Sequence, residues 1–279
     1  MIRANTLGSR LWGFAIWVVV GLFVLNLLAV IVTVVLDSFA IRWLGTWLPA
    51  GYTTHWYGDA WDEFQLSDVL LTTFEVVGAV VVLSGLLGVT AAYALARRDF
   101  PGRRAVVLVF LLPLLVPPLT YGIPMATLLY RSGLGGTLTG VILANLVPAI
   151  PFVVLVMIPF IEQIDPRVEA AARVFGASTL QLFLRVLGPL LLPGILAALL
   201  LVMVRTIAMF ELTFLVAGPE SQTLIVALYY AVFASGVRAG QSVDVIAVVY
   251  MVTTLVWLLL ALRFVNPTQI VARARAAKV

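Results

Sequence analysis

Four ionisable residues lie within or at the ends of long apolar runs of this chain, and they are the first candidates for a chemical role. Glu75 lies about two turns into one run, Arg205 lies within another, Glu211 lies near the end of that second run, and Asp244 begins a later one. An ionisable group in hydrocarbon costs about 2.5–3.5 kcal/mol on insertion scales. We therefore expect these residues either to line a path for a polar solute or to neutralise each other, as a Glu75–Arg205 pair between helices.

Four uncharged residues join the candidates for a solute path because their side chains are polar, polarisable or aromatic. They are Tyr121, Asn145, Met209 and Phe210.

The residue types that perform most enzyme chemistry are scarce. The chain has no cysteine, which excludes disulfides, thiolate metal sites and thiol catalysis. His55 is the single histidine, so no histidine cluster can hold a metal. Lys278 is the single lysine and lies at the C-terminal end, whereas a Walker P-loop needs a lysine directly after a glycine-rich loop. We predict no catalytic residue, no metal site and no cofactor bound by this chain.

Composition places the chain in a membrane. Of its 279 residues 63% are hydrophobic and 11% are charged, with a mean hydropathy of +1.13. A soluble fold of this length cannot cover so much apolar surface. A helix needs about 20 apolar residues to cross the hydrocarbon core. We therefore predict an all-α integral membrane protein with six transmembrane helices, at about Leu11–Leu36, Val69–Ala96, Ala105–Tyr130, Leu138–Phe160, Leu190–Glu211 and Val243–Phe264.

The distribution of basic residues predicts the orientation. Thirteen of the 17 basic residues fall in the two terminal segments, in the loop between the second and third runs, and in the segment after the fourth run. Basic residues favour the cytoplasmic side. We expect both termini and the segment after the fourth run to be cytoplasmic. The thirteen are Arg3, Arg10, Arg97, Arg98, Arg103, Arg104, Arg167, Arg173, Arg185, Arg263, Arg273, Arg275 and Lys278.

The longest segment expected on the outer side runs from Asp37 to Asp68 and is rich in tryptophan and tyrosine. Aromatic residues at this depth are typical of the interfacial belt of membrane proteins. The second interpretation is that the segment contacts an extracytoplasmic protein through its acidic residues Asp59, Asp62 and Glu63.

The polar stretch between the fourth and fifth runs predicts a bent pair of helices at the membrane surface. Asp165 is a good N-cap and Pro166 suits the first helical position. Gly176 ends or bends this helix, and Ser178 can cap a second one through Arg185. We call residues 166–185 the elbow.

The elbow resembles a known family. The sequence EAAARVFGAS followed by RVLGPLLLPG is similar to the EAA loop of the permease subunits of binding-protein-dependent ABC importers, of the type I or MetI-like class. Ala171, Ala172, Gly176 and Pro189 match that pattern. The glutamate does not, because Ala170 stands at its usual place and Glu169 lies one residue earlier, about 100° around a helix. The sequence therefore does not assign to Glu169 the salt bridge that the family glutamate offers its ATPase.

Looser matches at AYALARRDFPGRR, LLPLLVPPLTYGIP and Pro151–Phe152 extend the resemblance over about residues 67–265. The resemblance implies a single transmembrane permease domain over 1–279, with a first helix and outer aromatic segment at about 1–66, a permease core at about 67–265 and a cytoplasmic tail at 266–279.

The resemblance also implies a transport subunit of the bacterial-type plasma (inner) membrane. Its implied partners are two cytosolic ATP-binding subunits that carry ATP and Mg, a second permease subunit that is homologous or identical, an extracytoplasmic substrate-binding protein and the lipid bilayer. Nucleic acid is not among them. The residues implied to couple to the ATPase are Val168, Glu169, Ala170, Ala171, Ala172, Arg173, Phe175, Gly176, Ala177 and Ser178.

The solute is less defined. An apolar residue, Phe175, precedes the elbow glycine, and with LLPLLVPP this is more similar to the polyamine and inorganic-ion branch of the family than to the carbohydrate branch, which is the alternative. Glu75, Glu211 and Asp244 would suit a cation, whereas Arg205 argues for an anion. From other classes, a secondary transporter or channel would need no elbow, and a scaffold protein would need no charges within the membrane.

Overall fold

The computed structural model describes residues 7–233 and 239–264, which are helical over most of their length and contain no strand. Arg3, Arg238, Arg273, Arg275, Lys278 and the expected tail at 266–279 lie outside the described residues. The described residues divide into two units, one within residues 7–63 and 239–249 and one within residues 64–233 and 250–264.

The smaller unit contains α1 (Leu7–Ser38) and α2 (His55–Glu63), and α12 (Gly240–Phe264) begins in it. The segment between α1 and α2 is held by aromatic side chains. Trp56 Nε1 donates to the carbonyl of Ala40 at 2.8 Å, and the hydroxyls of Ser38 and Tyr57 lie 3.0 Å apart. Trp47 is 98% exposed, so this segment also presents an aromatic side chain outward.

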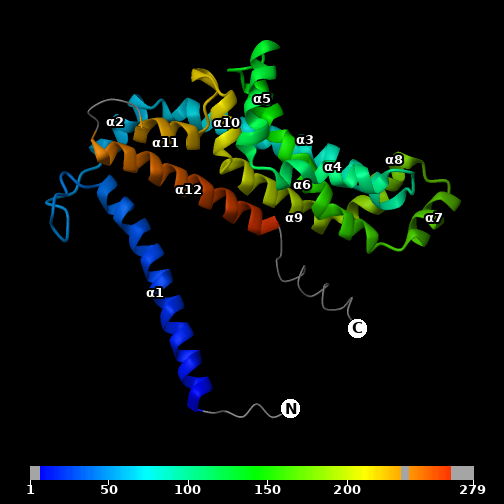
Figure 1. Cartoon of the computed structure of the whole chain (residues 1–279), viewed down its shortest axis with the longest axis horizontal. Helices are drawn as coiled ribbons and strands as arrows, with labels where there is room; N and C mark the ends of the chain where they lie inside the picture. Colours follow the sequence, from blue (N-terminus) through cyan, green and yellow to red (C-terminus); the bar gives the residue numbers. More distant parts are fainter. Residues whose placement is uncertain (1–6, 234–238, 265–279) are drawn as a thin grey trace. The chain divides into compact units, whose positions relative to one another are not determined.

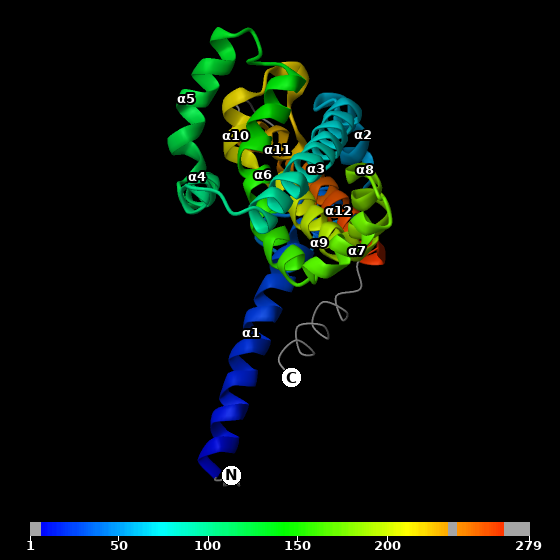
Figure 2. The same cartoon turned by 90° about the vertical axis from the view of Figure 1, so that its right-hand side faces the viewer.

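The larger unit is built on α3 (Leu66–Arg97), α6 (Leu138–Glu162) and α9 (Gly188–Ile207), which pack side by side in Figures 1 and 2. Its core consists mainly of aliphatic side chains of these three helices, and other helices of the unit add further aliphatic side chains. Gly88 on α3 permits the close approach to α6, because an added Cβ would lie 2.6 Å from Val153 Cβ. Gly88 therefore serves packing, as small residues do between membrane helices.

The span count agrees with the sequence. Five described helices are long and apolar enough to cross a membrane, and there are six if α4 (Arg103–Leu115) and α5 (Pro118–Arg131) together count as one bent span. The elbow lies between the fourth and fifth spans, as predicted. The orientation of the termini remains a prediction.

Two of the predicted spans are wrong in form. The third was expected as one helix, but α4 and α5 meet at a 97° bend, which both views show. Pro117 and Pro118 explain the break, since proline lacks a backbone N–H and disfavours helical geometry in the residue before it. The fifth was expected to reach Glu211, yet α9 ends at Ile207 and Glu211 belongs to the short helix α10 (Phe210–Val216).

Side-chain and backbone contacts hold α10 in its separate position. Asn145 Nδ2 on α6 donates to Thr213 Oγ1 at 3.1 Å, and the Gly136 N–H donates to the Val216 carbonyl at 2.8 Å. A further apolar helix, α11 (Leu224–Phe233), follows and is fastened to α3 by the Leu224 N–H, which donates to Thr73 Oγ1 at 2.9 Å.

The orientation can be tested in this cysteine-free chain. Cysteines introduced at the exposed positions Ser132 or Glu220 should react with an impermeant thiol reagent added outside intact cells, because the arginine asymmetry places both loops outside. A cysteine at Asp99, whose side chain is 99% exposed, should react only after the membrane is permeabilised. Labelling of the Asp99→Cys variant in intact cells, with protection of the other two, would reverse the topology.

Candidate functional site

The first half of the elbow is a short helix with the predicted start. Asp165 Oδ1 accepts a hydrogen bond from the Arg167 N–H at 2.9 Å and Pro166 occupies the first turn of α7 (Pro166–Val174). The N-cap prediction is confirmed. An acidic residue here also suits the positive end of the helix dipole.

The bend of the elbow depends on Gly176. Its φ of +81° lies in the left-handed region, where glycine is favoured. The Ala177 N–H donates to the Ala172 carbonyl at 3.1 Å and the Gly176 N–H donates to the Arg173 carbonyl at 3.0 Å. This pair of bonds is a Schellman motif, which satisfies the last carbonyls of α7 and reverses the chain.

The second half of the elbow starts with a capping box. The Gln181 N–H donates to Ser178 Oγ at 3.3 Å and the Ser178 N–H donates to Gln181 Oε1 at 2.9 Å. One helical turn, α8 (Thr179–Gln181), passes into a π-helical segment, η1 (Leu182–Leu187), and then into α9. The second helix of the elbow is therefore continuous with the membrane span.

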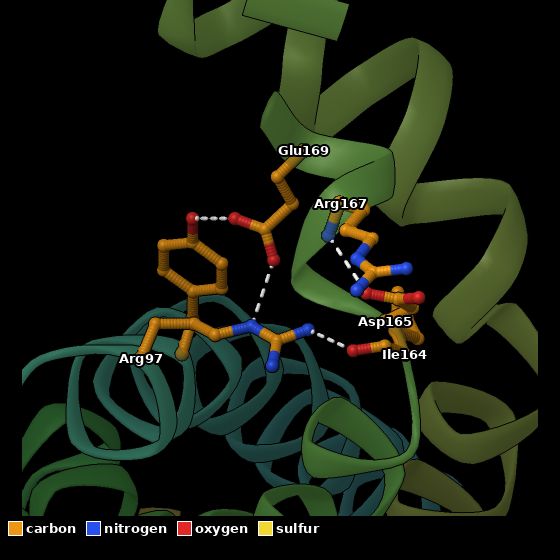
Figure 3. Close-up of polar contacts among 6 residues, drawn as sticks. Arg97, Ile164, Asp165, Arg167 and Glu169 are labelled. Carbon is orange, nitrogen blue, oxygen red and sulfur yellow. Dashed lines mark hydrogen bonds and ion pairs between the residues drawn. The ribbon is translucent and has the colours of Figure 1, made fainter. Parts of the chain in front are cut away.

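A buried ion pair fastens the elbow to α3 (Figure 3). Glu169 is only 7% exposed, and its Oε1 accepts a hydrogen bond from Arg97 Nε at 2.7 Å. Its Oε2 accepts from the Tyr93 hydroxyl at 2.5 Å. Arg97 Nη2 donates to the Ile164 carbonyl at 2.6 Å, so the same guanidinium also holds the entry to α7. Both charges are satisfied by partners within this chain.

Glu169, which lies one residue before the usual glutamate position of the family pattern, points away from the exposed side of the elbow. Glu169 faces the helix bundle, whereas Ala170, at the position of the family glutamate, is exposed. Most other residues expected to couple are also exposed, and only Ala172 and Ala177 are half-buried. Val174 and Phe175 are 85% and 90% exposed. We call these two the elbow tip.

The candidates within the membrane are brought together in part. Asn145, Arg205 and Met209 line one small cavity, which we call the Arg205 cavity. Its remaining walls come from Pro148, Ala149, Phe152, Val202 and Thr206. Tyr121 lies within electrostatic range of both Arg205 and Glu211. These groups come from α5, α6, α9 and α10, all in the larger unit.

The other candidates lie elsewhere. Glu75 is exposed on α3, is not a wall of the Arg205 cavity, and forms no ion pair with Arg205 in the described part of the chain. Phe210 belongs to an aromatic cluster, with ring centroids 5.1 Å from Phe214 and 4.9 Å from Tyr229. Asp244 lies in the first turns of α12, within the smaller unit.

Sequence reasoning missed several residues that complete these sites. Arg97 is predicted only as a cytoplasmic charge and as part of the AYALARRDFPGRR match, which also contains Tyr93, and no contact with the elbow is predicted for either residue. Their spacing of four residues on one helix was an available signal, because it places both on the same face. Phe152 was noted only as part of a dipeptide; its ring lies 4.8 Å from the Arg205 guanidinium carbon.

Comparison with known proteins identifies the family. Residues 84–271 match the family described as "Binding-protein-dependent transport system inner membrane component". The chain belongs to this family. It is therefore a multi-pass inner-membrane transport subunit, and the family is not catalytic itself.

The curated relatives of this family member have several different substrates in their names. The diacetylchitobiose uptake system permease protein of Streptomyces coelicolor is 33% identical over 153 residues, 53% of this chain and 51% of the relative. The molybdenum transport system permease protein of Haemophilus influenzae is 34% identical over 160 residues, which cover 51% of this chain and 69% of the relative. The sulfate transport system permease protein of Salmonella typhimurium is 31% identical over 149 residues, which cover 49% of this chain and 54% of the relative. The chain spans about half the length of the first and third.

Solved structures support the fold of the family member. A crystal structure of a bacterial ABC transporter involved in import of the acidic polysaccharide alginate superposes with a TM-score of 0.78 at 20% identity, covering 91% of this chain and 96% of that one. An inward-facing methionine ABC transporter superposes with a TM-score of 0.53 at 18% identity, covering 71% of this chain and 95% of that one.

The Arg97–Glu169 pair generates a stability prediction. Glu169→Leu leaves the Arg97 charge, 13% exposed, without its carboxylate, and should lower the unfolding free energy by about 3 kcal/mol, because removing one partner strands a buried charge. The double variant Arg97→Met/Glu169→Leu should lose less unfolding free energy than the Glu169→Leu variant. Thermal denaturation of the full chain in detergent measures both.

The exposed pair of Arg103 and Asp99, with the Asp99 side chain 99% exposed, is the matched control. Asp99→Asn should leave the melting temperature nearly unchanged, since solvent screens such pairs. If the loss of unfolding free energy in the Arg97/Glu169 double variant equals the sum of the losses in the two single variants, the result would contradict a coupled ion pair.

Proposed function

We propose that this chain is a membrane-spanning subunit of an ATP-driven importer that forms half of the translocation pathway, with the elbow contacting a cytosolic ATP-hydrolysing subunit. The observation that carries the proposal is the elbow itself: an exposed apolar tip on a bent helix pair, held rigidly to the membrane bundle by the buried Arg97–Glu169 pair. Such a projection fits a cleft on another protein, because exposed apolar side chains anchor interfaces.

The geometry suits the transfer of movement between subunits. Force on the elbow tip reaches α3 through Glu169 and Arg97, and it reaches α9 through the continuous segment after Ser178. Two connections to two packed helices leave the elbow little freedom to move independently. A change in the ATP-hydrolysing subunit would therefore shift the helices that carry Arg205 and its neighbours.

The partners follow from the family description and from the chemistry of the chain. A chain whose single lysine is Lys278 has no Walker P-loop, so ATP and Mg would bind to two partner subunits. A second permease subunit, homologous or identical, would supply the other half of the pathway. One of the solved structures holds its transporter in complex with a periplasmic protein bound to an alginate pentasaccharide, which supports an extracytoplasmic substrate-binding protein here.

For the solute we propose the polyamine and inorganic-ion branch. Phe175 before the elbow glycine supports this choice, and relatives named for molybdenum and sulfate transport agree with its inorganic-ion part. Carbohydrate is the second candidate, since other relatives are named for diacetylchitobiose and for melibiose, raffinose and stachyose. An ATP-independent transporter would have no ATP-hydrolysing subunit for the elbow to contact.

Substitution of Gly176 tests the elbow. An added Cβ would meet no heavy atom within 4 Å, so only the backbone conformation limits this position. Gly176→Val should lose the bend, because a β-branched residue strongly disfavours positive φ, whereas Gly176→Asn should keep it. In complexes purified from membranes through a tag on this chain, the valine variant should retain less than about a tenth of the ATP-binding subunit and its ATPase activity.

Phe175→Asp tests the surface separately, because it alters the exposed tip without changing the bend. It should reduce co-purification of the ATP-binding subunit while the chain inserts normally. Normal capture and coupled ATP hydrolysis in both Gly176→Val and Phe175→Asp would refute the elbow as the contact.

A further inference from the structure

The polar groups around the Arg205 cavity have bonding capacity that the described chain leaves unused. Arg205 lies in the apolar span Thr179–Ile207, yet its side chain is exposed. Among the described residues no carboxylate lies within ion-pair distance of it. A guanidinium turned toward lipid is costly, so this surface is better suited to an aqueous path.

The contact of Arg205 with Phe152 leaves the guanidinium able to bind a solute. Its carbon lies 4.8 Å from the centroid of the Phe152 ring. An aromatic ring under a guanidinium fixes the side chain through the cation–π interaction but accepts no conventional hydrogen bond. The N–H groups of the fork therefore remain available, in a geometry that matches two oxygens of one anionic group.

Asn145 supplies the second half of the site. Its side chain is 2% exposed, and Nδ2 donates to the Val141 carbonyl at 2.9 Å and to Thr213 Oγ1 at 3.1 Å. The carbonyl acceptor fixes which end of the amide is nitrogen. Oδ1 is therefore a buried acceptor without a partner among the described residues, in a side chain that lines the cavity, and the Tyr121 hydroxyl is also buried without a partner there. Unpaired buried polar atoms are rare and costly.

We propose that Arg205, held by Phe152 beside the cavity that Asn145 lines, forms a station in the translocation path that selects solutes bearing an oxyanion group. This inference rests on the proposed permease function, and it favours an anionic solute over the polyamine part of the proposed branch. The guanidinium would donate to the anionic oxygens. Asn145 Oδ1, which is buried, would accept from a water molecule in the cavity.

The cavity of about 10 Å³ has room for about one water molecule, so a solute would meet the station at the exposed side of Arg205. Glu211 also acts on the Tyr121 hydroxyl, but it is not a wall of the cavity, whereas Arg205 and Met209 are. Arg205 is therefore the charged side chain on the cavity wall. Both inorganic oxyanions and the carboxylates of acidic sugars have the required chemistry.

Charged thiol reagents measure this selectivity directly. Met209→Cys places a single thiol on the cavity wall of a cysteine-free chain. In the full complex in proteoliposomes, an anionic methanethiosulfonate should react with it faster, relative to a cationic one of similar size, than with a cysteine at exposed Ser132. Arg205→Gln in the Met209→Cys background should lower the anion-to-cation rate ratio by about tenfold, since one nearby charge is lost. Arg205→Lys should preserve the ratio.

Protection experiments identify the solute chemistry. Sulfate and molybdate should slow labelling of the Met209→Cys variant if the station accepts inorganic oxyanions, and glucuronate should slow it if the station accepts acidic sugars; either result supports the proposal. Glucose and spermidine should not protect. Arg205→Lys should weaken protection, because lysine lacks the planar fork. Glu211→Gln is the matched control and should raise the rate ratio.

Three results would overturn the proposal: a rate ratio unchanged by Arg205→Gln, protection by spermidine that Glu211→Gln abolishes, or no protection by any oxyanion. Labelling does not require ATP hydrolysis. A complex that selects anions but captures no ATP-binding subunit would therefore contradict the proposed coupling alone, and a coupled complex without anion selection would contradict the station alone.

Discussion

The ion pair between Arg97 and Glu169 is the contact on which the arrangement of the elbow depends. It joins the end of α3 to a helix 72 residues later in the chain, and it does so where both side chains are largely removed from water. Taking two charges out of water is costly unless they are close and further hydrogen bonds satisfy them. Tyr93 and the Ile164 carbonyl supply those bonds. A local helix pair thereby becomes a fixed part of the membrane bundle.

The position of the glutamate explains how the elbow differs from the family pattern. A shift of one residue turns a side chain by about 100° on a helix. Glu169 consequently faces α3, and the exposed side of α7 presents alanine at the usual glutamate position. Contacts with an ATP-hydrolysing subunit would then rest on shape and on the apolar tip of Val174 and Phe175.

Charges inside the bundle also need partners, and Arg97 and Arg205 have different ones. Arg97 pairs with a carboxylate, while Arg205, among the described residues, pairs with no carboxylate and contacts the face of an aromatic ring. The chain breaks at Pro117 and at Ala208–Met209, and α10 packs against both α5 and α6, so that Asn145 and Thr213 meet from different segments. The irregular backbone lies where polar groups gather, which is where membrane proteins tolerate it.

The sequence by itself determined the membrane class, the number of spans, the capping residues Asp165 and Ser178, and the turn at Gly176. Each of these is a local property, since apolar length, side-chain caps and positive φ depend on a few neighbouring residues. Only the tertiary structure decided that Glu169 pairs with Arg97, that Glu75 does not pair with Arg205, and that α10 separates from α9. These outcomes depend on the packing of helices distant in sequence, and a shift of one residue along a helix changes which neighbour a side chain faces.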